Sequence, residues 1–202
     1  MFKEKVSAAV LKAIESSPIG IAPLDILESL QLCDDDTLKT TISRLNTSGK
    51  IIRLKRGVYS TNPMKDAFAC AQSTFNGYLG FTSALYIHKL ITEVPFTITV
   101  VTLWDSGTKA FGQYFFKAVS LKEKAIGFEN KGFYVVSTRA KTLFDCLYLP
   151  HYAVEEEKLI EAFRQAKLTA KEWKEFGHYV EKFASPEMVE KMKAAKKSII
   201  GD

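Results

Sequence analysis

The chain has 202 residues, of which 47% are hydrophobic, a share that is ordinary for a protein with a globular core. Lys and Glu interrupt every apolar run before it reaches membrane-spanning length, and no basic leader with an apolar stretch opens the sequence, so a soluble, cytoplasmic protein with no membrane partner is expected. The net charge of +5 favours a polyanionic partner only where the positive charge is concentrated.

Apolar residues recur at helical spacing at the start of the chain and predict three helices. The first covers residues 2–15, and a short second helix begins at Pro23. The third follows the aspartates at 34–36, whose carboxylates suit an N-cap and a first turn, and it ends at Gly49. The expected buried faces are Val6, Val10, Leu11 and Ile14, then Leu24, Leu27 and Leu30, and finally Leu38, Ile42 and Leu45.

Two short strands follow, over 51–54 and 58–60, and Arg56-Gly57 suits the tight turn between them. Three helices with a two-stranded ribbon after the third are the pattern of a winged helix-turn-helix. The sequence therefore predicts a DNA-binding domain of this type over residues 1–62.

The positive charge is concentrated between residues 37 and 60, which include six basic residues and no acidic one. With the apolar stripe of the third helix turned inward, helical rotation directs four residues outward, where such a helix enters the major groove. These candidate base readers are Lys39, Thr40, Ser43 and Arg44. The ribbon would meet phosphates or a minor groove through Lys50, Arg53, Lys55 and Arg56. A solvated helix face, or a winged helix that binds protein, is the alternative.

The second domain is expected over residues 63–202, after an Asn-Pro boundary. A helix over 64–74 opens it, and Thr82 or Ser83 can cap the next helix. The alternation that begins at Phe96 predicts a strand. Further strands are expected over 111–119, 125–128 and 133–136, and helices over 138–147, 155–165, 170–183 and 186–199. The predicted fold class is α+β, in which a small antiparallel sheet is followed by a helical C-terminal region.

Cysteines and histidines give no metal or disulfide pattern. The cysteines are widely spaced without a Cys-x-x-Cys pair, and the histidines lie apart from one another and from every cysteine. These residues are Cys33, Cys70 and Cys146, and His88, His151 and His178. We expect neither a metal nor a cofactor.

One enzymatic alternative is a magnesium-dependent nuclease. Glu129 and Lys131 stand two apart, with Asp105 after an earlier strand, and such a trio can hold magnesium and activate water. The segment Glu-Asn-Lys-Gly at 129–132 is also a natural hairpin turn, and this reading is favoured. The protein is therefore expected not to be an enzyme.

Several segments in a fixed order carry a resemblance to a known family. The ribbon ends in RLKRGVYS, and FTSALYIHKLITEVP, TITVVT and VVSTRAKTLFDCL follow. This set, within residues 37–147, resembles the AbiEi family, the antitoxin and transcriptional-repressor component of type IV toxin-antitoxin systems. The resemblance implies a DNA-binding winged helix followed by an antitoxin domain, repression of the protein's own operon, and pairing with a nucleotidyltransferase-like toxin.

The resemblance also marks an antitoxin motif. Its helix start maps onto Ser83, Ala84 and Leu85, and its strand-to-helix segment maps onto Ser137, Thr138, Arg139, Thr142, Leu143 and Asp145. The candidate site residues among them are Ser83, Arg139 and Asp145. This chain has Lys141 where the family commonly has a second arginine, and His88-Lys89-Leu90 where the family often has Gly before Leu.

The residues of that segment can be read independently of the family. Arg139 and Lys141 fall in the first turn of a predicted helix, where positive charge opposes the helix macrodipole. Lys141 and Asp145 are one turn apart and are predicted to pair, and Arg139 is predicted to reach a carboxylate or carbonyl elsewhere in the domain. A structural ion-pair network is favoured over a functional site.

Together these patterns predict a repressor that binds double-stranded DNA at its own promoter, as a pair of protomers on an inverted repeat. The second domain would supply the antitoxin function. The alternative is a stand-alone winged-helix regulator whose second domain binds a small effector or another protein.

Overall fold

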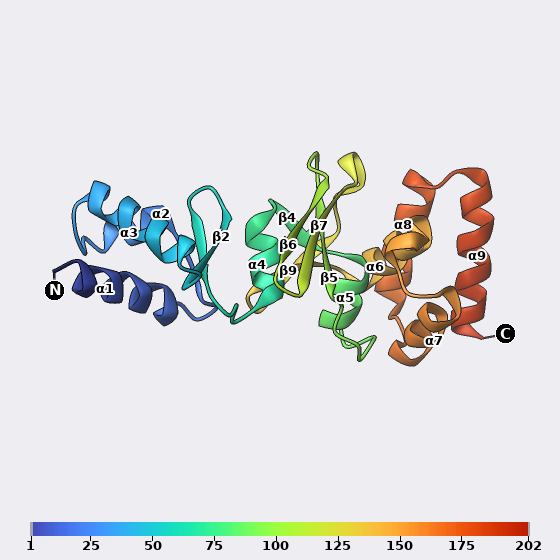
Figure 1. Cartoon of the computed structure of the whole chain (residues 1–202). Helices are drawn as coiled ribbons and strands as arrows, with labels where there is room; N and C mark the ends of the chain where they lie inside the picture. Colours follow the sequence, from blue (N-terminus) through green and yellow to red (C-terminus); the bar gives the residue numbers. More distant parts are fainter. Residues whose placement is uncertain (1, 202) are drawn as a thin grey trace. The chain divides into compact units, whose positions relative to one another are not determined.

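The computed structural model describes the backbone of residues 2–201 and the side chains of residues 5–201. Within that part, the chain is an α+β protein with nine α-helices, a three-stranded sheet and a six-stranded sheet (Figure 1). It divides into two compact units, the first ending at Thr74 and the second beginning at Phe75. Among residues 2–201, none of the helices combines the length and the apolar composition that crossing a lipid bilayer requires.

The first unit contains the three helices expected from the sequence and a fourth. They are α1 (Phe2–Ser16), α2 (Leu24–Ser29), α3 (Asp35–Thr47) and α4 (Ala67–Thr74). α3 begins where the Asp34 carboxylate accepts the backbone N–H of Thr37 at 2.9 Å, and the chain leaves it through Gly49 at φ +70°. The apolar faces of α1, α2 and α3 meet in one core, which includes Val6, Val10, Ile14, Leu27, Leu38, Ile42 and Leu45. Leu30, which was expected to be buried, is exposed because α2 ends at Ser29.

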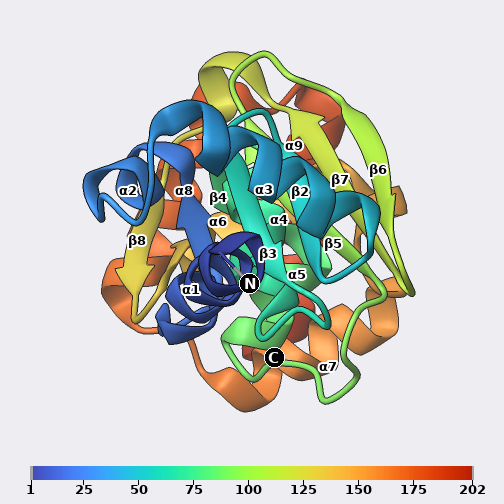
Figure 2. The same ribbon diagram turned by 60° about the vertical axis from the view of Figure 1, so that its left-hand side comes forward.

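The sheet of the first unit is antiparallel, with the strand order β1-β3-β2. Its strands are β1 (Ile21–Pro23), β2 (Ile51–Lys55) and β3 (Val58–Thr61). β2 and β3 form the predicted ribbon, and α3 lies beside β2 (Figure 2). The sequence does not predict β1, because three residues are too few to show the alternation of a strand. β1 also depends on a distant partner, since Ile21 lies opposite Ser60.

The helix expected to open the second domain belongs to the first unit. α4 packs against β2 and β3, and its Cys70 Sγ lies 3.3 Å from the Ser60 Oγ of β3, both buried. The first unit therefore continues past the Asn62-Pro63 boundary signal to Thr74. An Asn-Pro pair marks a turn of the backbone, whereas the extent of a unit is set by which elements bury surface together.

The second unit contains a mixed sheet with the strand order β6-β7-β5-β4-β9-β8. Its strands are β4 (Gly77–Leu79), β5 (Thr97–Thr102), β6 (Gly107–Phe111), β7 (Tyr114–Ser120), β8 (Phe128–Lys131) and β9 (Tyr134–Ser137). The predicted small antiparallel sheet is wrong in two respects, since it has six strands and since β5 with β7 and β4 with β9 run parallel. Side-chain alternation along a strand does not report its direction relative to its neighbours.

Two of the predicted strands have different bounds. The strand expected over 111–119 is part of a hairpin, because Phe111 ends β6 and lies opposite Tyr114, the start of β7. Of the strand expected over 125–128, Phe128 alone lies in a strand, as the first residue of β8. A short 3-10 turn (Lys122–Lys124) precedes this segment, and Ala125 is buried in the helical core as a loop residue. Its burial explains the apolar pattern that mimicked a strand.

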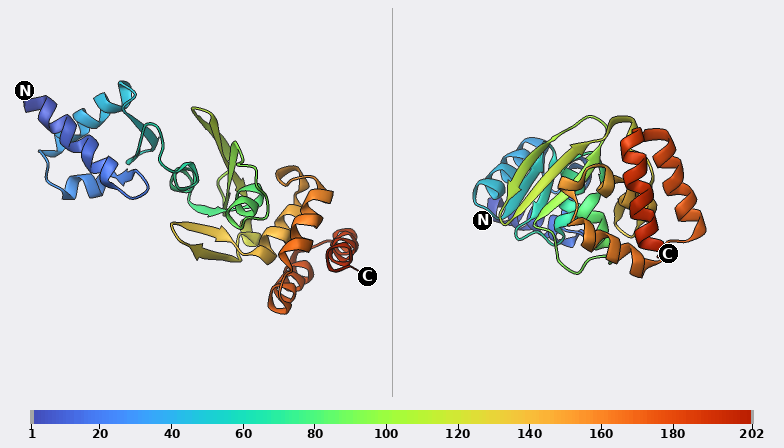
Figure 3. Two further views of the ribbon diagram at one scale, coloured as in Figure 1. Left: turned by 90° about the horizontal axis from the view of Figure 1, so that it is seen from below. Right: turned by 90° about the vertical axis from the view of Figure 1, so that its right-hand side faces the viewer.

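The helices of the second unit centre on α6. They are α5 (Phe81–Ile87), α6 (Arg139–Tyr148), α7 (Glu156–Ala166), α8 (Ala170–Phe183) and α9 (Pro186–Ile200), with a 3-10 turn at Pro150–Tyr152. α6 to α9 gather on one side of the sheet (Figure 3), and α6 contacts α5, α7, α8 and α9. Leu143 and Phe144 of α6 are fully buried. The residue that caps α5 is Gly80, so the predicted cap at Thr82 or Ser83 is wrong.

The β8–β9 hairpin is joined to the rest of the sheet over a short length. β8 and β9 pair with each other over four positions, and the pair recorded between β4 and β9 in the described chain is Leu79 opposite Val136. The rings of Tyr78 and Phe128 stack with centroids 5.1 Å apart and add a side-chain contact. The hairpin carries Glu129 and Lys131.

Candidate nucleic-acid interface and a charged pocket

The outward face of α3 carries the four residues predicted to read bases. Its exposed positions include Lys39, Thr40, Ser43 and Arg44. Its buried positions are Leu38, Thr41, Ile42 and Leu45. The helical rotation inferred from the apolar stripe is therefore confirmed.

Cationic side chains also line the end of α3 and the hairpin that follows it. Lys50, Arg53 and Arg56 are exposed, and Lys55 is half-buried. The backbone N–H of Arg53 donates to Asn46 Oδ1 at 2.9 Å and ties β2 to α3. The basic residues of the helix and of the hairpin therefore belong to adjacent elements of one packed unit.

Most of these cations lack a counter-charge. Among the side chains of residues 5–201, no ion pair or hydrogen bond is recorded for Arg44, Lys50, Arg53 or Arg56. Lys39 Nζ lies 3.7 Å from Glu28 Oε1, a long contact at an exposed site that contributes little. Unpaired surface cations raise the affinity for a polyanion without regard to its sequence.

A carboxylate cluster at 34–36 stands at the N-terminus of α3. The backbone N–H of Thr37 donates to the Asp34 carboxylate and holds the pKa of Asp34 below its ordinary value. Negative charge here disfavours phosphate at this end of the helix. The cationic surface therefore begins at Lys39.

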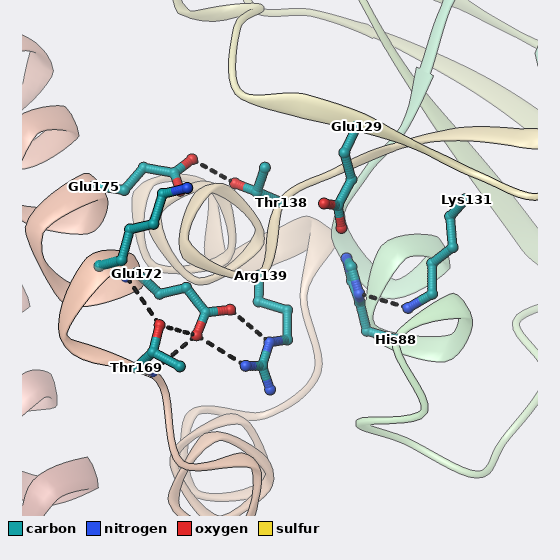
Figure 4. Close-up of a pocket in the computed structure, with 9 residues that line it drawn as sticks. His88, Glu129, Lys131, Thr138, Arg139, Thr169, Glu172 and Glu175 are labelled. Atoms are coloured by element: carbon teal, nitrogen blue, oxygen red, sulfur yellow. Dashed lines mark hydrogen bonds and ion pairs between the residues drawn. The ribbon is translucent and has the colours of Figure 1, made fainter.

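The three antitoxin-motif residues lie in different surroundings. Ser83 is buried, and its Oγ accepts the backbone N–H of Thr99 at 2.8 Å, which joins α5 to β5. Asp145 is buried in the helical core, and Arg139 is half-buried at the first turn of α6. The structure does not bring the three side chains together, and Arg139 alone of the three lines the pocket of Figure 4.

That pocket has a volume of about 560 Å³ and is lined by polar side chains from four segments of the second unit (Figure 4). Its lining residues are His88, Glu129, Lys131, Thr138, Arg139, Thr169, Lys171, Glu172 and Glu175. The acidic and basic side chains balance in number. Most of them pair with one another, while no hydrogen bond or ion pair of the Glu129 or Lys171 side chain is recorded among the described residues.

Arg139 binds both oxygens of one carboxylate on α8. Its Nε lies 2.7 Å from Glu172 Oε1, its Nη2 lies 2.8 Å from Glu172 Oε2, and its Nη1 donates to the Ala166 carbonyl at 3.3 Å. The predicted reach of Arg139 to a carboxylate is confirmed. Glu172 also accepts the backbone N–H of Thr169 at 2.8 Å and closes the capping box of α8.

A second carboxylate of α8 joins α6 in the same way. Glu175 Oε1 accepts the hydroxyl of Thr138 at 2.6 Å and the hydroxyl of Tyr179 at 2.6 Å. Burial raises the pKa of Tyr179, and the hydrogen bond to Glu175 raises it further. Thr138 also caps α6 by accepting the backbone N–H of Lys141. These bonds fix the start of α6 against α8.

His88 forms the opposite wall of the pocket, and its proton positions follow from its partners. Its Nε2 lies 2.7 Å from the Ser137 carbonyl and must donate, so Nδ1 accepts from Lys131 Nζ at 3.1 Å. Burial lowers the pKa of His88, the Ser137 carbonyl offsets part of this, and Lys131 lowers the pKa further. Figure 4 shows the Glu129 carboxylate pointing toward the ring. His88 is therefore a neutral side chain whose free lone pair is already occupied.

The predicted pair between Lys141 and Asp145 is confirmed, and it is fully buried. Burial raises the pKa of Asp145 to about 6, an effect larger than the opposing attraction of Lys141. Burial likewise lowers the pKa of Lys141, against the attraction of Asp145. The second carboxylate oxygen, Oδ2, has no hydrogen-bond partner in the part of the chain that the structure describes. Sequence spacing indicated this pair but gave no sign that both charges lie inside the core.

The residues of the nuclease alternative are not assembled. Glu129 and Lys131 lie on β8 and line the pocket, but Asp105 follows β5, which β4 and β9 separate from β8. Across the described residues, no group of three or more His, Cys, Asp or Glu side chains is placed to hold a metal ion. Residues 129–131 belong to β8, and the hairpin turns at Gly132-Phe133, two residues later than predicted.

Sequence reasoning missed the partners that complete the pocket. His88 meets Lys131 across 43 residues, and Arg139 meets Glu172 across 33 residues. A local sequence pattern does not reveal contacts between residues so far apart. The capping-box spacing of Thr169 and Glu172 is a local signal, and it could have predicted the start of α8.

Comparison with protein-family models and with curated protein sequences gives no match for the chain.

Proposed function

We propose that the protein is a DNA-binding transcriptional repressor whose first unit is a winged helix-turn-helix and whose second unit is the antitoxin domain of a type IV toxin-antitoxin system. The observation that supports DNA binding best is the positive charge of Arg44, Lys50, Arg53 and Arg56, for which no side-chain partner is recorded among residues 5–201. The AbiEi resemblance of the sequence supports the antitoxin assignment.

In this proposal, α3 enters the major groove with its exposed polar face. Arg and Lys side chains read guanine edges, and Thr and Ser hydroxyls accept from or donate to either strand. The hairpin cations lie on phosphates and set the register of the helix. Two protomers on an inverted repeat would block polymerase at the protein's own promoter, in the cytoplasm, and no catalysis is required.

The test is a gel shift of the full chain with the DNA upstream of its own gene, at several salt concentrations. The wild type is compared with Arg53→Gln/Arg56→Gln and with the charge-matched control Lys122→Gln/Lys174→Gln, which changes exposed residues of the second unit. Each lost phosphate contact reduces the slope of log affinity against log salt by about 0.9. The slope of the hairpin variant should be smaller by roughly twice this amount, and the slope of the control should equal that of the wild type. Equal slopes in all three proteins would show that Arg53 and Arg56 do not contact DNA phosphates.

A second candidate is a stand-alone regulator whose second unit binds a small polar effector. The pocket of about 560 Å³ lined by His88, Arg139 and Glu172 favours it. A neighbouring gene for a nucleotidyltransferase, and suppression of that protein's toxicity by the second unit, would favour the antitoxin instead. Loss of that suppression on Arg139→Gln, with the chain still folded, would assign the pocket to the antitoxin function.

A further inference from the structure

A separate pocket of about 450 Å³ lies in the first unit, between α1, α3 and the turn that leads into β2. Its apolar floor consists of Leu11 and Leu45, and Ala8 lines the pocket from an exposed position of α1. Leu45 is buried in the core of the first unit, and Leu11 packs against that core, so this floor is part of the folded framework. The volume falls within the range of about 300–1,000 Å³ that small-molecule sites occupy.

The rim of this pocket is cationic. Arg44 and Lys50 line it, and both side chains are exposed without a recorded partner among residues 5–201. Two serines complete the rim, and the Ser48 hydroxyl donates to the Leu45 carbonyl at 3.1 Å, which leaves its oxygen free to accept. Among the side chains of residues 5–201, no carboxylate lines the pocket. The site therefore pairs an apolar floor with uncompensated positive charge on one side.

That combination selects one ligand chemistry. A guanidinium binds a carboxylate through two parallel hydrogen bonds, and an ammonium adds a point charge. An apolar tail gains free energy by leaving water for the floor, whereas an inorganic anion gains nothing there. A cationic head would be repelled by Arg44 and Lys50, and a neutral alcohol would leave both cations unpaired.

We propose that this pocket binds a single-chain amphiphilic carboxylate, with its head between Arg44 and Lys50 and its tail along Ala8, Leu11 and Leu45. Arg44 is also an outward residue of α3. A ligand that engages Arg44 withdraws it from DNA, so the ligand acts as an inducer. This second step, unlike the binding itself, rests on the proposed DNA-binding function.

Binding is tested first without DNA, by calorimetric titration of the full chain with octanoate. We expect saturable binding of one octanoate per chain, and no binding of 1-octanol or octylamine. Ala8→Phe fills the pocket from an exposed position of α1 and should weaken binding at least about tenfold. Ser16→Phe, at an exposed position of the same helix outside the pocket, should bind as the wild type does.

The results that overturn the site are equally definite. Octanoate that fails to saturate, or Ala8→Phe that binds octanoate like Ser16→Phe, excludes the pocket. Inorganic phosphate that displaces octanoate at equal concentration shows that the apolar floor contributes nothing. Arg44→Gln/Lys50→Gln must lose octanoate binding while keeping the denaturation midpoint of the wild type within the range seen for Ser16→Phe; retained binding also overturns the proposal.

Regulation is tested by repeating the gel shift with saturating octanoate. The dissociation constant for DNA should rise by about tenfold, within the usual range of coupling between two sites, and DNA should weaken octanoate by the same factor. Octanoate binding with unchanged DNA affinity would retain the site and reject the inducer role. A chain that binds octanoate but no DNA at all would reject the proposed function and leave the site standing.

Discussion

Arg139 and Glu172 lock the N-termini of two helices together, since Arg139 is the first residue of α6 and Glu172 lies in the first turn of α8. A cation at the start of α6 opposes the macrodipole, and the carboxylate offsets that cost. Burial alone would raise the pKa of Glu172, but the hydrogen bonds from Arg139 and Thr169 outweigh it and hold the pKa below its ordinary value. The pair is therefore structural in its first effect.

Arg139→Gln should lower the free energy of unfolding by about 1.5–3 kcal/mol, the usual worth of hydrogen bonds to a charged group. The matched control is Lys193→Gln, which breaks an exposed pair with Glu190 and should cost no more than about 0.5 kcal/mol. Urea denaturation followed by circular dichroism measures both. An equal loss of unfolding free energy in the two variants would show that the bidentate pair of Arg139 and Glu172 contributes no more than an exposed ion pair.

Lys141 and Asp145 form an ion pair inside the core, so removing one partner strands the other. Lys141→Met should cost about 3–5 kcal/mol, because the Asp145 carboxyl then lacks the one partner recorded for it among residues 5–201. The double variant Lys141→Met/Asp145→Leu should recover most of that loss, since buried pairs are often replaced by apolar groups at little cost. Denaturation of the single and double variants forms the cycle. A double variant as unstable as the sum of the singles would refute the compensation.

The raised pKa of Asp145 predicts an unusual pH dependence. The folded state takes up a proton near pH 6, whereas the unfolded state does so near 3.8, so folding is favoured as the pH falls through that window. Lys141 faces this carboxyl, and the ionisable Tyr78, Tyr179 and Cys146 sense its charge. Burial raises the pKa values of Tyr78, Tyr179 and Cys146 and so moves them further above the window. The wild type should therefore gain stability relative to Asp145→Asn between pH 7 and pH 4, as measured by thermal melts at matched ionic strength. A constant difference would show that Asp145 does not titrate there.

Gly127 stands where a side chain would collide with α8. A Cβ there would lie 2.1 Å from Tyr179 Oη, and the backbone has φ +74°. Gly132 has a similar φ of +66°, but a Cβ there would meet nothing within 4 Å. Gly132→Ala should cost about 1 kcal/mol from backbone strain alone, and Gly127→Ala should cost a further 1–3 kcal/mol from overlap, roughly the range for overpacking. Tyr179→Phe should relieve part of the second cost, which urea denaturation would detect.

The two parts of the DNA surface should respond differently to substitution. Lys39→Ala or Arg44→Ala on α3 should cost about 1–3 kcal/mol in binding and relax the preference at one base pair. Arg53→Ala or Lys55→Ala on the hairpin should weaken all sequences alike and lower the salt slope by about one. Competition between the operator and single-base variants separates the two effects. A hairpin substitution that changes base preference would place β2 in the groove.

The sequence predicted best those elements whose signals are local. α8 has the predicted bounds 170–183, and α3 follows from Asp34, its apolar stripe and Gly49. Outward and inward residues of α3 were also assigned correctly, because one buried stripe fixes the rotation of a helix.

Elements that depend on distant partners could not be predicted in this way. β1 and β4 have three residues each, and they exist because a strand elsewhere in the chain completes their hydrogen bonds. The direction of β7 beside β5 and the contact of His88 with Lys131 are long-range in the same sense. The charged pocket is built almost wholly from such long-range contacts. The sequence therefore does not show that its lining residues lie together.

The β8–β9 hairpin meets β4 at the pair of Leu79 and Val136, so its position depends on side chains more than on the backbone ladder. His88 holds this hairpin through both ring nitrogens, one bound to the Ser137 carbonyl and the other to Lys131 Nζ. The stacked rings of Tyr78 and Phe128 add a further contact between the hairpin and β4. His88 thus anchors the β8–β9 hairpin. Loss of its side chain should make the hairpin more mobile and change the shape of the pocket.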